Sequence, residues 1–517
     1  MTEYGNVFCV ISPLKITSYH KGGYFYKSLT YFQTNFDRRS KKQKGLYQMK
    51  EFIINGTAMK CYPLTAAQRL HFYTIKFAKP QVLNIGTGLY IKQDVNFDVL
   101  KQSIQEAISD FDSMRLRFIQ DEDGTVYQYV VPFDEREIGF FDFSGWSESD
   151  AHEEMTKWTH KPLERFNSAM NRVVMIKYPG GYNGIYLKVD HMTMDSSSII
   201  EFNKRVLELY CAKAYDYPHP KPLQSYIKAV EHDLEYEKKS NASHKKDEEF
   251  WKSQIEGDEP MYTDFTGPGR LITQRRESGN PDLRSAVITS NTLDAAISVY
   301  HLEGEPSARL LDFCAENKVS MASLLLMGLR TVLSKFNNDE KDVSVKTNVA
   351  RRGTLLEKHS GGTRIHFFPL RTILEPEQTF IEGIRTIQAE QNKIFRHANY
   401  DPIELTMERA KYRKFAPGAS YESISLTYQP LTLREKNTEM PDIDYKTFWY
   451  SNGVAAQPLY LTVMHRPEDN GLNFNFEYKK DVVSDSEMEF LYYYYCRVLF
   501  RGIEDKTRTI GQILEMI

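Results

Sequence analysis

Residues 185–195 have the sequence Ile-Tyr-Leu-Lys-Val-Asp-His-Met-Thr-Met-Asp, in which apolar side chains alternate with more polar ones up to a histidine. Alternation with a period of two predicts a β-strand. In a straight strand His191 shares the apolar, inward-facing parity, and Asp190 lies on the opposite one. Asp195 follows the strand, and Ser196 opens a run of serines that is typical of a helix N-terminus. The pattern predicts a strand, a turn and a helix, with His191 at the strand end.

His191 is a candidate general base. An imidazole with an ordinary pKa near ~6.5 can accept a proton at neutral pH and return it, and a substrate can reach a residue at a strand end. The spacing His-x-x-x-Asp also occurs by chance, and a histidine that ends a buried strand is often a hydrogen-bonded core residue. The isolated pentapeptide leaves both interpretations open.

The surrounding sequence resembles the His-His-x-x-x-Asp-Gly core of the condensation domains of nonribosomal peptide synthetases and of their relatives, the chloramphenicol acetyltransferase-like acyltransferases. Other motifs similar to those of this family follow in the expected order over about residues 60–515. They are Tyr-Pro-Leu-Thr-Ala-Ala-Gln at 62–68, Met-Arg-Leu-Arg-Phe at 114–118, Phe-Trp at 250–251, Val-Ser-Met-Ala-Ser-Leu-Leu at 319–325, Val-Ala-Arg-Arg at 349–352, Gly-Gly-Thr-Arg-Ile-His-Phe-Phe-Pro-Leu-Arg at 361–371, Tyr-Asp-Pro at 400–402 and Leu-Thr-Tyr-Gln at 426–429. Their ordered co-occurrence is more specific than any single match.

The fold implied by the resemblance is α/β, with two chloramphenicol acetyltransferase-like halves that form a V-shaped pseudo-dimer around a central tunnel. A length of 517 residues suits two such units. The strongly charged stretch 232–257 is expected to form one long exposed helix between them. The expected division is an unassigned N-terminal extension at 1–58, a first half with the motif at 59–232, a charged helix and linker at 233–297, and a second half at 298–517.

Hydrophobic periodicity predicts several further elements. The predicted helices cover 97–109, 149–160 and 484–500. The predicted strands cover 86–91, 343–349, 424–428, 459–464 and 472–478.

The resemblance also implies a role for each residue of the motif. His191 matches the family's second histidine, which orients or deprotonates the acceptor nucleophile, and Asp195 matches an aspartate that is chiefly structural. Arg172 occupies the place of the family's structural arginine, so we expect a salt bridge between Arg172 and Asp195 that holds the turn. Asp190 and Ser196 depart from the pattern, because the family has a histidine and a glycine at these places.

The two departures leave alternatives open. Asp190 is either a solvated or hydrogen-bonded structural carboxylate or a group that tunes the neighbouring histidine, although its strand parity argues against direct contact. Ser196 replaces a residue that can adopt positive φ, so a reshaped turn and reduced activity are one outcome. His366 and Tyr428 are candidates for lining the tunnel from the second half, and a packed or surface histidine on a strand is the competing interpretation of His366.

The activity implied by the resemblance is acyl transfer from a thioester to an amine, as in nonribosomal peptide or related natural-product biosynthesis. The donor is held on the phosphopantetheine arm of an acyl or peptidyl carrier protein or on coenzyme A, and no bound cofactor is expected. Because the chain ends soon after the last matched motif, we expect a stand-alone condensation-type acyltransferase. The alternatives are a catalytically impaired binding or recruitment module, and a relative that acylates an alcohol or epimerises or cyclises a carrier-bound substrate.

Charge and cysteine usage argue against other classes of function. Lys and Arg total 66 and Asp and Glu total 69, so a net charge of -3 gives no reason to expect nucleic acid or an anionic membrane as partner. Five dispersed cysteines, at positions 9, 61, 211, 314 and 496, form no metal-binding pattern with each other or with histidines. Such a set fits reduced thiols, and no run of about 18 apolar residues is present to span a membrane. We therefore expect a cytoplasmic protein without a metal site.

Overall fold

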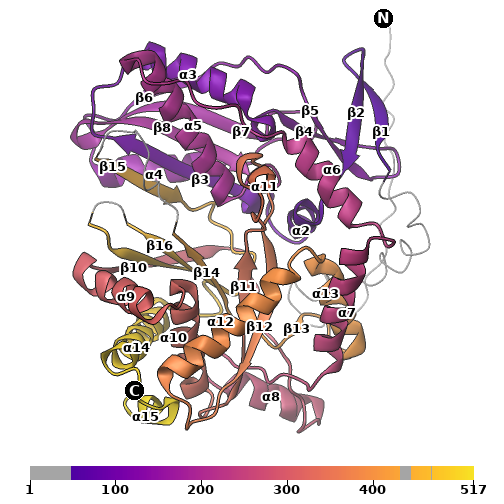
Figure 1. Cartoon of the computed structure of the whole chain (residues 1–517), viewed down its shortest axis with the longest axis vertical. Helices are drawn as coiled ribbons and strands as arrows, with labels where there is room; N and C mark the ends of the chain where they lie inside the picture. Colours follow the sequence, from indigo (N-terminus) through magenta and orange to yellow (C-terminus); the bar gives the residue numbers. More distant parts are fainter. Residues whose placement is uncertain (1–47, 431–443, 467–468) are drawn as a thin grey trace, which may run out of the picture.

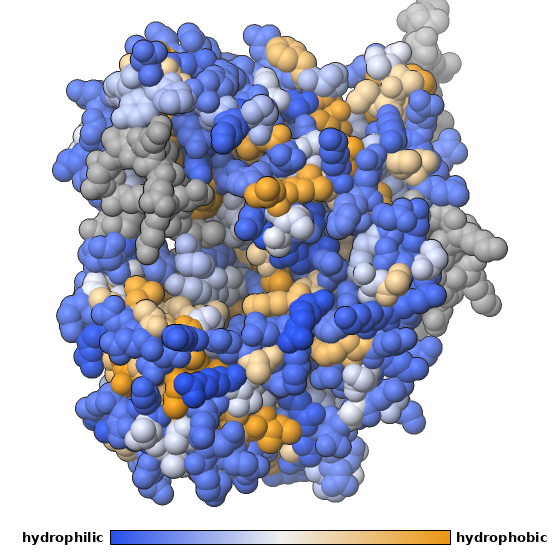
Figure 2. Space-filling view, viewed as in Figure 1, coloured by the Kyte–Doolittle hydropathy of each residue, from blue (hydrophilic) through white to orange (hydrophobic). Residues whose placement is uncertain are grey.

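The computed structural model describes residues 48–430, 444–466 and 469–517. Figure 1 shows two lobes, one built from the first part of the chain and the other mostly from the second. Most of the expected N-terminal extension, including Cys9, lies outside the described residues. Hydrophilic residues dominate the face seen in Figure 2, where hydrophobic residues form small separate patches.

A five-stranded sheet in the order β15-β3-β8-β7-β6 forms the centre of the N-terminal lobe. Neighbouring strands run antiparallel except β6 and β7, which are parallel. The strands are β3 (Asn84–Ile91), β6 (Gly139–Asp142), β7 (Asn171–Tyr178), β8 (Tyr182–Asp190) and β15 (Tyr445–Tyr450).

Helices cover both faces of this sheet. They are α3 (Phe97–Asp110) and α5 (Ser196–Tyr215) on one face and α4 (Glu148–His160) on the other. Ile185, Leu187 and Val189 of β8 pack toward α3 and α5, while Tyr186 packs toward α4. The even-numbered side chains of β8 are therefore buried as well, and neither parity of the strand faces solvent.

A second, four-stranded sheet in the order β1-β2-β5-β4 flanks the first lobe. Its strands are β1 (Lys50–Ile54), β2 (Thr57–Pro63), β4 (Leu116–Gln120) and β5 (Val126–Val130). The short helices of this lobe are α2 (Ala66–Thr74), η2 (Pro80–Leu83), η3 (Asp112–Met114) and η4 (Pro179–Gly181). Helix α2 begins with a capping box between Thr65 and Gln68, so the sequence fixes its start locally.

The charged region between the lobes forms two helices, so the expected single helix over 232–257 is wrong. Helix α6 ends at Tyr236, and Asn241 caps a new helix by accepting the backbone N–H groups of Ser243 and His244. This region is also not wholly exposed, because Trp251 is buried against the C-terminal lobe. The elements here are α6 (Tyr226–Tyr236), α7 (Ala242–Glu256), α8 (Gly269–Ser278) and β9 (Ala286–Val287), which pairs with β13 (Ala419–Ser420).

The C-terminal lobe is built on a six-stranded sheet in the order β10-β17-β16-β14-β11-β12. Its strands are β10 (Ala295–Leu302), β11 (Asp342–Val349), β12 (His366–Ile373), β14 (Ser425–Gln429), β16 (Leu459–His465) and β17 (Leu472–Lys479). The helices that follow β10 along the chain are α9 (Gly304–Asn317), α10 (Met321–Phe336), α11 (Leu355–His359), α12 (Phe380–Arg396), α13 (Pro402–Tyr412), α14 (Asp485–Glu504) and α15 (Ile510–Glu515). Of these, α11 lies beside α6, next to the N-terminal lobe (Figure 1).

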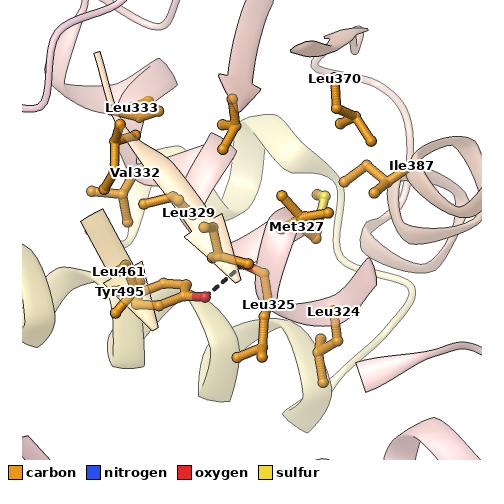
Figure 3. Packing of buried hydrophobic residues seen from close by; sticks show 14 of the residues in the cluster. Leu324, Leu325, Met327, Leu329, Val332, Leu333, Leu370, Ile387, Leu461 and Tyr495 are labelled. Atoms are coloured by element: carbon orange, nitrogen blue, oxygen red, sulfur yellow. Dashed lines mark hydrogen bonds between the residues drawn. The ribbon is translucent and has the colours of Figure 1, made fainter. Parts of the chain in front are cut away.

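Helix α10 forms the centre of the large apolar core of the C-terminal lobe. Its residues from Leu324 to Ser334 are all buried, because the sheet lies on one side and α12 and α14 on others. Figure 3 shows the packing, including Tyr495 of α14, whose hydroxyl donates a hydrogen bond of 2.7 Å to the carbonyl of Leu325. Within the described residues no single helix is long and apolar enough to cross a membrane; only α9 and α10 pass that test together, and they are bent by 111°.

The two faces of the six-stranded sheet differ in chemistry. Leu426, Leu461 and Phe476, which are register partners on β14, β16 and β17, belong to the apolar core under the helices. The opposite face, which we call the polar face, carries two rows of mainly polar side chains across the same strands. One row contains Lys346, Ser425, Tyr460 and Glu477, and the next contains Asn348, Thr427, Thr462 and Asn475.

The second part of the chain contributes one strand to the sheet of the N-terminal lobe. The chain leaves β14, enters the N-terminal sheet as β15 and then returns to β16 (Figure 1). All six residues of β15 pair with β3. The expected second half at 298–517 therefore contributes a strand to the first lobe, a feature that the sequence patterns do not reveal. The domain boundaries themselves stay a proposal.

Candidate active site

His191 follows the last residue of β8. Its backbone N–H donates a hydrogen bond of 2.7 Å to the carbonyl of Leu83, and its side chain keeps partial exposure. Burial is the largest influence on its pKa and lowers it, while the Asp195 carboxylate opposes the shift. The neutral imidazole, which is the form that accepts a proton, therefore dominates at neutral pH.

The ring of His191 is stacked on the ring of His71. Their centroids lie 3.9 Å apart and their planes meet at 23°. His71 comes from α2 and is only 5% exposed, and its Nε2 has no hydrogen-bond partner among the described residues. Burial and the neighbouring His191 lower the pKa of His71 well below its ordinary value. Sequence reasoning missed His71, although it lies three residues after the 62–68 motif.

Asp195 is held by groups from both lobes. Its Oδ1 caps α5 by accepting the N–H of Ser198 at 3.0 Å and pairs with Nη2 of Arg352 at 2.7 Å. Its Oδ2 accepts the backbone N–H of Arg364 at 2.9 Å. Burial alone would raise the pKa of Asp195, but Arg352 and these N–H donors outweigh burial and hold the pKa below its usual range. The aspartate is thus ionised and held in place by groups from both lobes.

The predicted salt bridge between Arg172 and Asp195 is wrong. Arg172 is exposed on β7 and pairs in register with Lys188, so it lies on the face of the sheet opposite to the parity of His191. The cation that reaches Asp195 is Arg352, which follows β11 in the other lobe. The Val-Ala-Arg-Arg motif at 349–352 contained this residue, but a sequence alone does not show which side chains meet across two lobes.

The segment 351–364 inserts into the N-terminal lobe at a second point as well. Asp233 of α6 pairs with both Arg351 and Arg364 at 3.0 Å, and all three side chains are buried. Gly362 has a φ of +81°, and a Cβ there would lie 2.1 Å from the ring of Tyr226. Glycine is therefore required where this segment packs against Tyr226 of α6.

Asp190 is a structural carboxylate in this fold. It is fully buried, its Oδ1 accepts the N–H of Met192 at 2.9 Å, and its Oδ2 lies 2.9 Å from Nε of Arg165. Burial is the largest influence on its pKa and raises it, while Arg165 opposes the shift. Asp190 is therefore buried and hydrogen-bonded rather than solvated. The Asp190 side chain lies on the other face of β8 from the parity of His191, and it supports the turn that carries His191.

Ser196 fits its position without backbone strain. It is the first residue of α5, and its φ is not among the positive values of the chain. The glycine expected from the family pattern is therefore not needed for this turn. The structure gives no sign that Ser196 reshapes it.

Neither candidate for lining a tunnel lies on the polar face. His366 is fully buried, with Nδ1 bonded to the Ala398 carbonyl at 2.9 Å and Nε2 lying 3.1 Å from Nη1 of Arg351. Burial, followed by Arg351, lowers its pKa well below the ordinary value. Tyr428 packs against the apolar core, and its hydroxyl bonds to Nε2 of His465 at 2.6 Å. The competing interpretation of His366 as a packed histidine is correct, and both candidates face the helices.

No group of three or more His, Cys, Asp or Glu side chains among the described residues is placed to hold a metal ion. The four described cysteines are free thiols. The arrangement offers a neutral imidazole, a stacked second imidazole and an ion pair between lobes. Such a site suits proton transfer to and from a bound substrate.

Comparison with curated proteins finds matches to parts of much longer synthases. The chain is 24% identical over 460 residues to surfactin synthase subunit 1 of Bacillus subtilis, covering 87% of this chain and 12% of that protein. It is 23% identical over 440 residues to bacitracin synthase 3 of Bacillus licheniformis, covering 84% of this chain and 6% of that protein. The chain therefore spans a small fraction of the curated relatives that it matches.

Solved structures share the same fold. The first condensation domain of the calcium-dependent antibiotic synthetase, in complex with a substrate analogue, matches with a TM-score of 0.72 at 18% identity, covering 87% of this chain and 98% of that one. A starter condensation domain of rhizomide synthetase in complex with C8-CoA also gives 0.72 at 18% identity, with 87% and 96% covered. These matches confirm the predicted two-lobed, chloramphenicol acetyltransferase-like α/β fold. Because the family model of the condensation domain matches residues 58–515, this chain belongs to the condensation domain family.

Proposed function

We propose that this chain is an acyltransferase that joins a thioester-bound acyl or aminoacyl group to an amine. The donor would be carried on the phosphopantetheine arm of a carrier protein or on coenzyme A, and would meet the acceptor in a channel between the lobes. The observation that carries the proposal is the position of His191, partly exposed at the end of β8 and beside an aspartate bound from the other lobe. The solved starter domain in complex with C8-CoA supports a thioester donor by analogy.

The proposed step needs one base and no covalent enzyme intermediate. The amine nitrogen attacks the thioester carbonyl carbon while Nε2 of His191 hydrogen-bonds to the amine or accepts its proton. The C–N bond forms, the C–S bond breaks, and the departing thiolate receives the proton. Positioning of both substrates can supply about 7–11 kcal/mol of the barrier, and general base catalysis about 10²- to 10⁴-fold in rate.

The lowered pKa of His191 supports this assignment, because a base must be neutral before it accepts a proton. The substitutions at positions 190 and 196 do not argue for a lost activity. Asp190 is buried in a structural ion pair, and Ser196 begins a helix without strain. We therefore favour a catalyst over a recruitment module.

The test is product formation by the purified protein with a panel of acyl-coenzyme A esters, loaded carrier proteins and amines, followed by mass spectrometry. We expect an amide product whose rate falls by about 10²- to 10⁴-fold in His191→Ala. Arg172→Ala is the control, because Arg172 is exposed and contacts neither His191 nor Asp195. Thioester binding without product in the unmodified protein would instead support the recruitment module, and ester formation with alcohols would correct the acceptor class.

A further inference from the structure

The polar face of the six-stranded sheet carries one carboxyl group without a counter-charge. Within the described residues no hydrogen bond or ion pair reaches the Glu477 carboxyl group, and burial is the influence on its pKa. Its register partners are Tyr460 on β16 and Ile297 on β10. Glu477 is partly exposed, so a ligand can reach it, yet burial raises its pKa to about 7. Leaving an unpaired carboxyl in such surroundings is costly unless another group completes it.

The neighbours of Glu477 supply hydrogen-bonding groups on one side and apolar surface on the other. The Tyr460 hydroxyl bonds to Oγ1 of Thr427 at 2.7 Å and accepts from Nδ2 of Asn348 at 2.8 Å. On the other side Ile297 and Val299 of β10 are 41% and 42% exposed. Both point to the same face as Glu477, since Ile297 pairs with it and Val299 is two residues further along β10. The surface thus suits a ligand with an apolar stem and a polar end.

Two lysines share this face with Glu477, namely Lys346 and Lys479. Lys346 lies in the same row as Glu477, but Ser425 and Tyr460 stand between them on β14 and β16. Three strand spacings of about 4.8 Å separate the two positions, which is too far for an ion pair. Burial lowers the pKa of Lys346, and the nearby Glu422 opposes this. Glu477 is therefore not neutralised by Lys346. Lys479, two residues further along β17 on the same face, is buried, and the charged group that acts on its pKa is Asp481 rather than Glu477.

The polar face is continuous with the strand ends that meet the motif. Asn348 lies four residues before Arg352, which binds Asp195. On the other side of the sheet, Asn452 precedes β16 and donates to the carbonyls of Val82 and Asn84 at 3.1 and 3.0 Å. Those two residues flank Leu83, whose carbonyl accepts the N–H of His191. The strands of the polar face thus continue into segments that hold Asp195 and the backbone next to His191.

We propose that Glu477 is a specificity-determining residue that binds an ammonium group at the end of an alkyl chain, as in a basic aminoacyl substrate, with Ile297 and Val299 contacting the chain. This inference rests on the proposed function, because the substrate is the thioester or amine that reacts at His191. A lysine-like group matches the geometry, since its methylenes can lie on the apolar strand β10 while its cation reaches the carboxylate.

The test is a binding comparison that does not depend on turnover. The probes are lysyl and norleucyl amides of N-acetylethylenediamine, which differ at the side-chain end by the ammonium group and cannot be consumed. Calorimetry at pH 8, where the carboxyl is ionised, should give tighter binding of the lysyl probe by about tenfold or more, because a hydrogen bond to a charged group contributes at least that factor. Glu477→Gln should abolish the preference and leave norleucyl binding unchanged. Glu375→Gln, which alters a surface ion pair with Lys341, should keep the preference.

Lowering the pH should weaken the preference as Glu477 takes up a proton, while Tyr460 beside it stays neutral throughout. Equal binding of both probes by the unmodified protein, or a preference that survives Glu477→Gln, would overturn the role of Glu477 and leave the proposed function standing. Failure of the unmodified protein to bind either probe would also overturn the role of Glu477, whereas the proposed function is overturned only by absence of product with the acyl-coenzyme A and carrier-protein panel.

Discussion

Replacing Arg352 by methionine removes the cation that joins the two lobes at the motif. Asp195 is 2% exposed and would lose its contact at 2.7 Å with Arg352. Removing one partner of a buried ion pair costs about 3–5 kcal/mol, against a typical total stability of about 5–15 kcal/mol. Asp195 keeps the N–H groups of Ser198 and Arg364, so we expect a cost near ~3 kcal/mol for this variant.

A double-mutant cycle measures how much of this cost belongs to the pair. The variants are Arg352→Met, Asp195→Asn and the combination, and the assay is urea unfolding at pH 7 followed by circular dichroism. In Asp195→Asn the amide can still cap Ser198, but it leaves Arg352 unpaired and removes the carboxylate acceptor of the Arg364 N–H. We expect the double variant to be more stable than the sum of the single losses predicts, with a coupling of about 1–3 kcal/mol.

Arg172→Met is the matched control, since it removes the arginine that the sequence proposed for the same role. Arg172 is exposed, so its loss should change stability by no more than about 0.5 kcal/mol. Equal destabilisation by Arg172→Met and Arg352→Met, or strict additivity in the cycle, would refute the assignment of Arg352 as the partner of Asp195.

Three further changes test the charges around the site by the same unfolding assay. The pKa of Glu477 is raised in the folded state, so the stability contributed by the protonated carboxyl is lost as pH rises from about 4.5 through about 7. The free energy of unfolding of Glu477→Gln should therefore exceed that of the unmodified protein by a margin that grows across this range, by up to about 1.4 kcal/mol per pH unit. A difference that does not change with pH would contradict the raised pKa. The pKa of His71 is shifted in the opposite direction, so the stability contributed by its neutral ring is present above about pH 6.5 and lost on acidification. In His71→Phe the free energy of unfolding should therefore fall less steeply below pH 6.5, by about 1.4 kcal/mol per pH unit. An unchanged slope would show that the pKa of His71 is not lowered. Asp190→Ala should cost about 2–4 kcal/mol because Arg165 loses its partner and the Met192 N–H its acceptor, whereas a neutral effect would show that the turn does not depend on this carboxylate.

Local patterns predict the elements of this fold because they depend on neighbouring residues. The strand that ends before His191, the helices predicted at 97–109 and 484–500, and the strand predicted at 472–478 all form close to the predicted places. The sequence analysis does not predict the break before Asn241, because one capping asparagine within a long charged stretch is hard to distinguish from the polar residues of a continuous helix. Charge alone carries no information on where a helix ends.

Contacts between lobes could not be predicted in the same way. Arg172 and Arg352 are both arginines near apolar strands, and only the register of β7 and the insertion of 351–364 decide which one meets Asp195. The polar face was available from the sequence in part, since Asn473, Asn475 and Glu477 alternate with buried residues along β17. What the alternation does not show is that these residues share a face with Lys346 and Tyr460, because strand order is a property of the whole sheet.

The placement of the motif links stability of the lobe interface to chemistry. Arg352 holds the Asp195 carboxylate. The carbonyl of Leu83, which accepts the backbone N–H of His191, lies between the carbonyls of Val82 and Asn84, and both of these accept from Asn452. Groups from the later part of the chain therefore support the histidine at two places. Because α2 supplies the stacked His71 from a third direction, the imidazole cannot shift without moving contacts in both lobes. A change that loosens the interface should therefore reduce activity before the lobes unfold, and the loss should appear in the rate of the acylation step, which depends on geometry within about 1 Å.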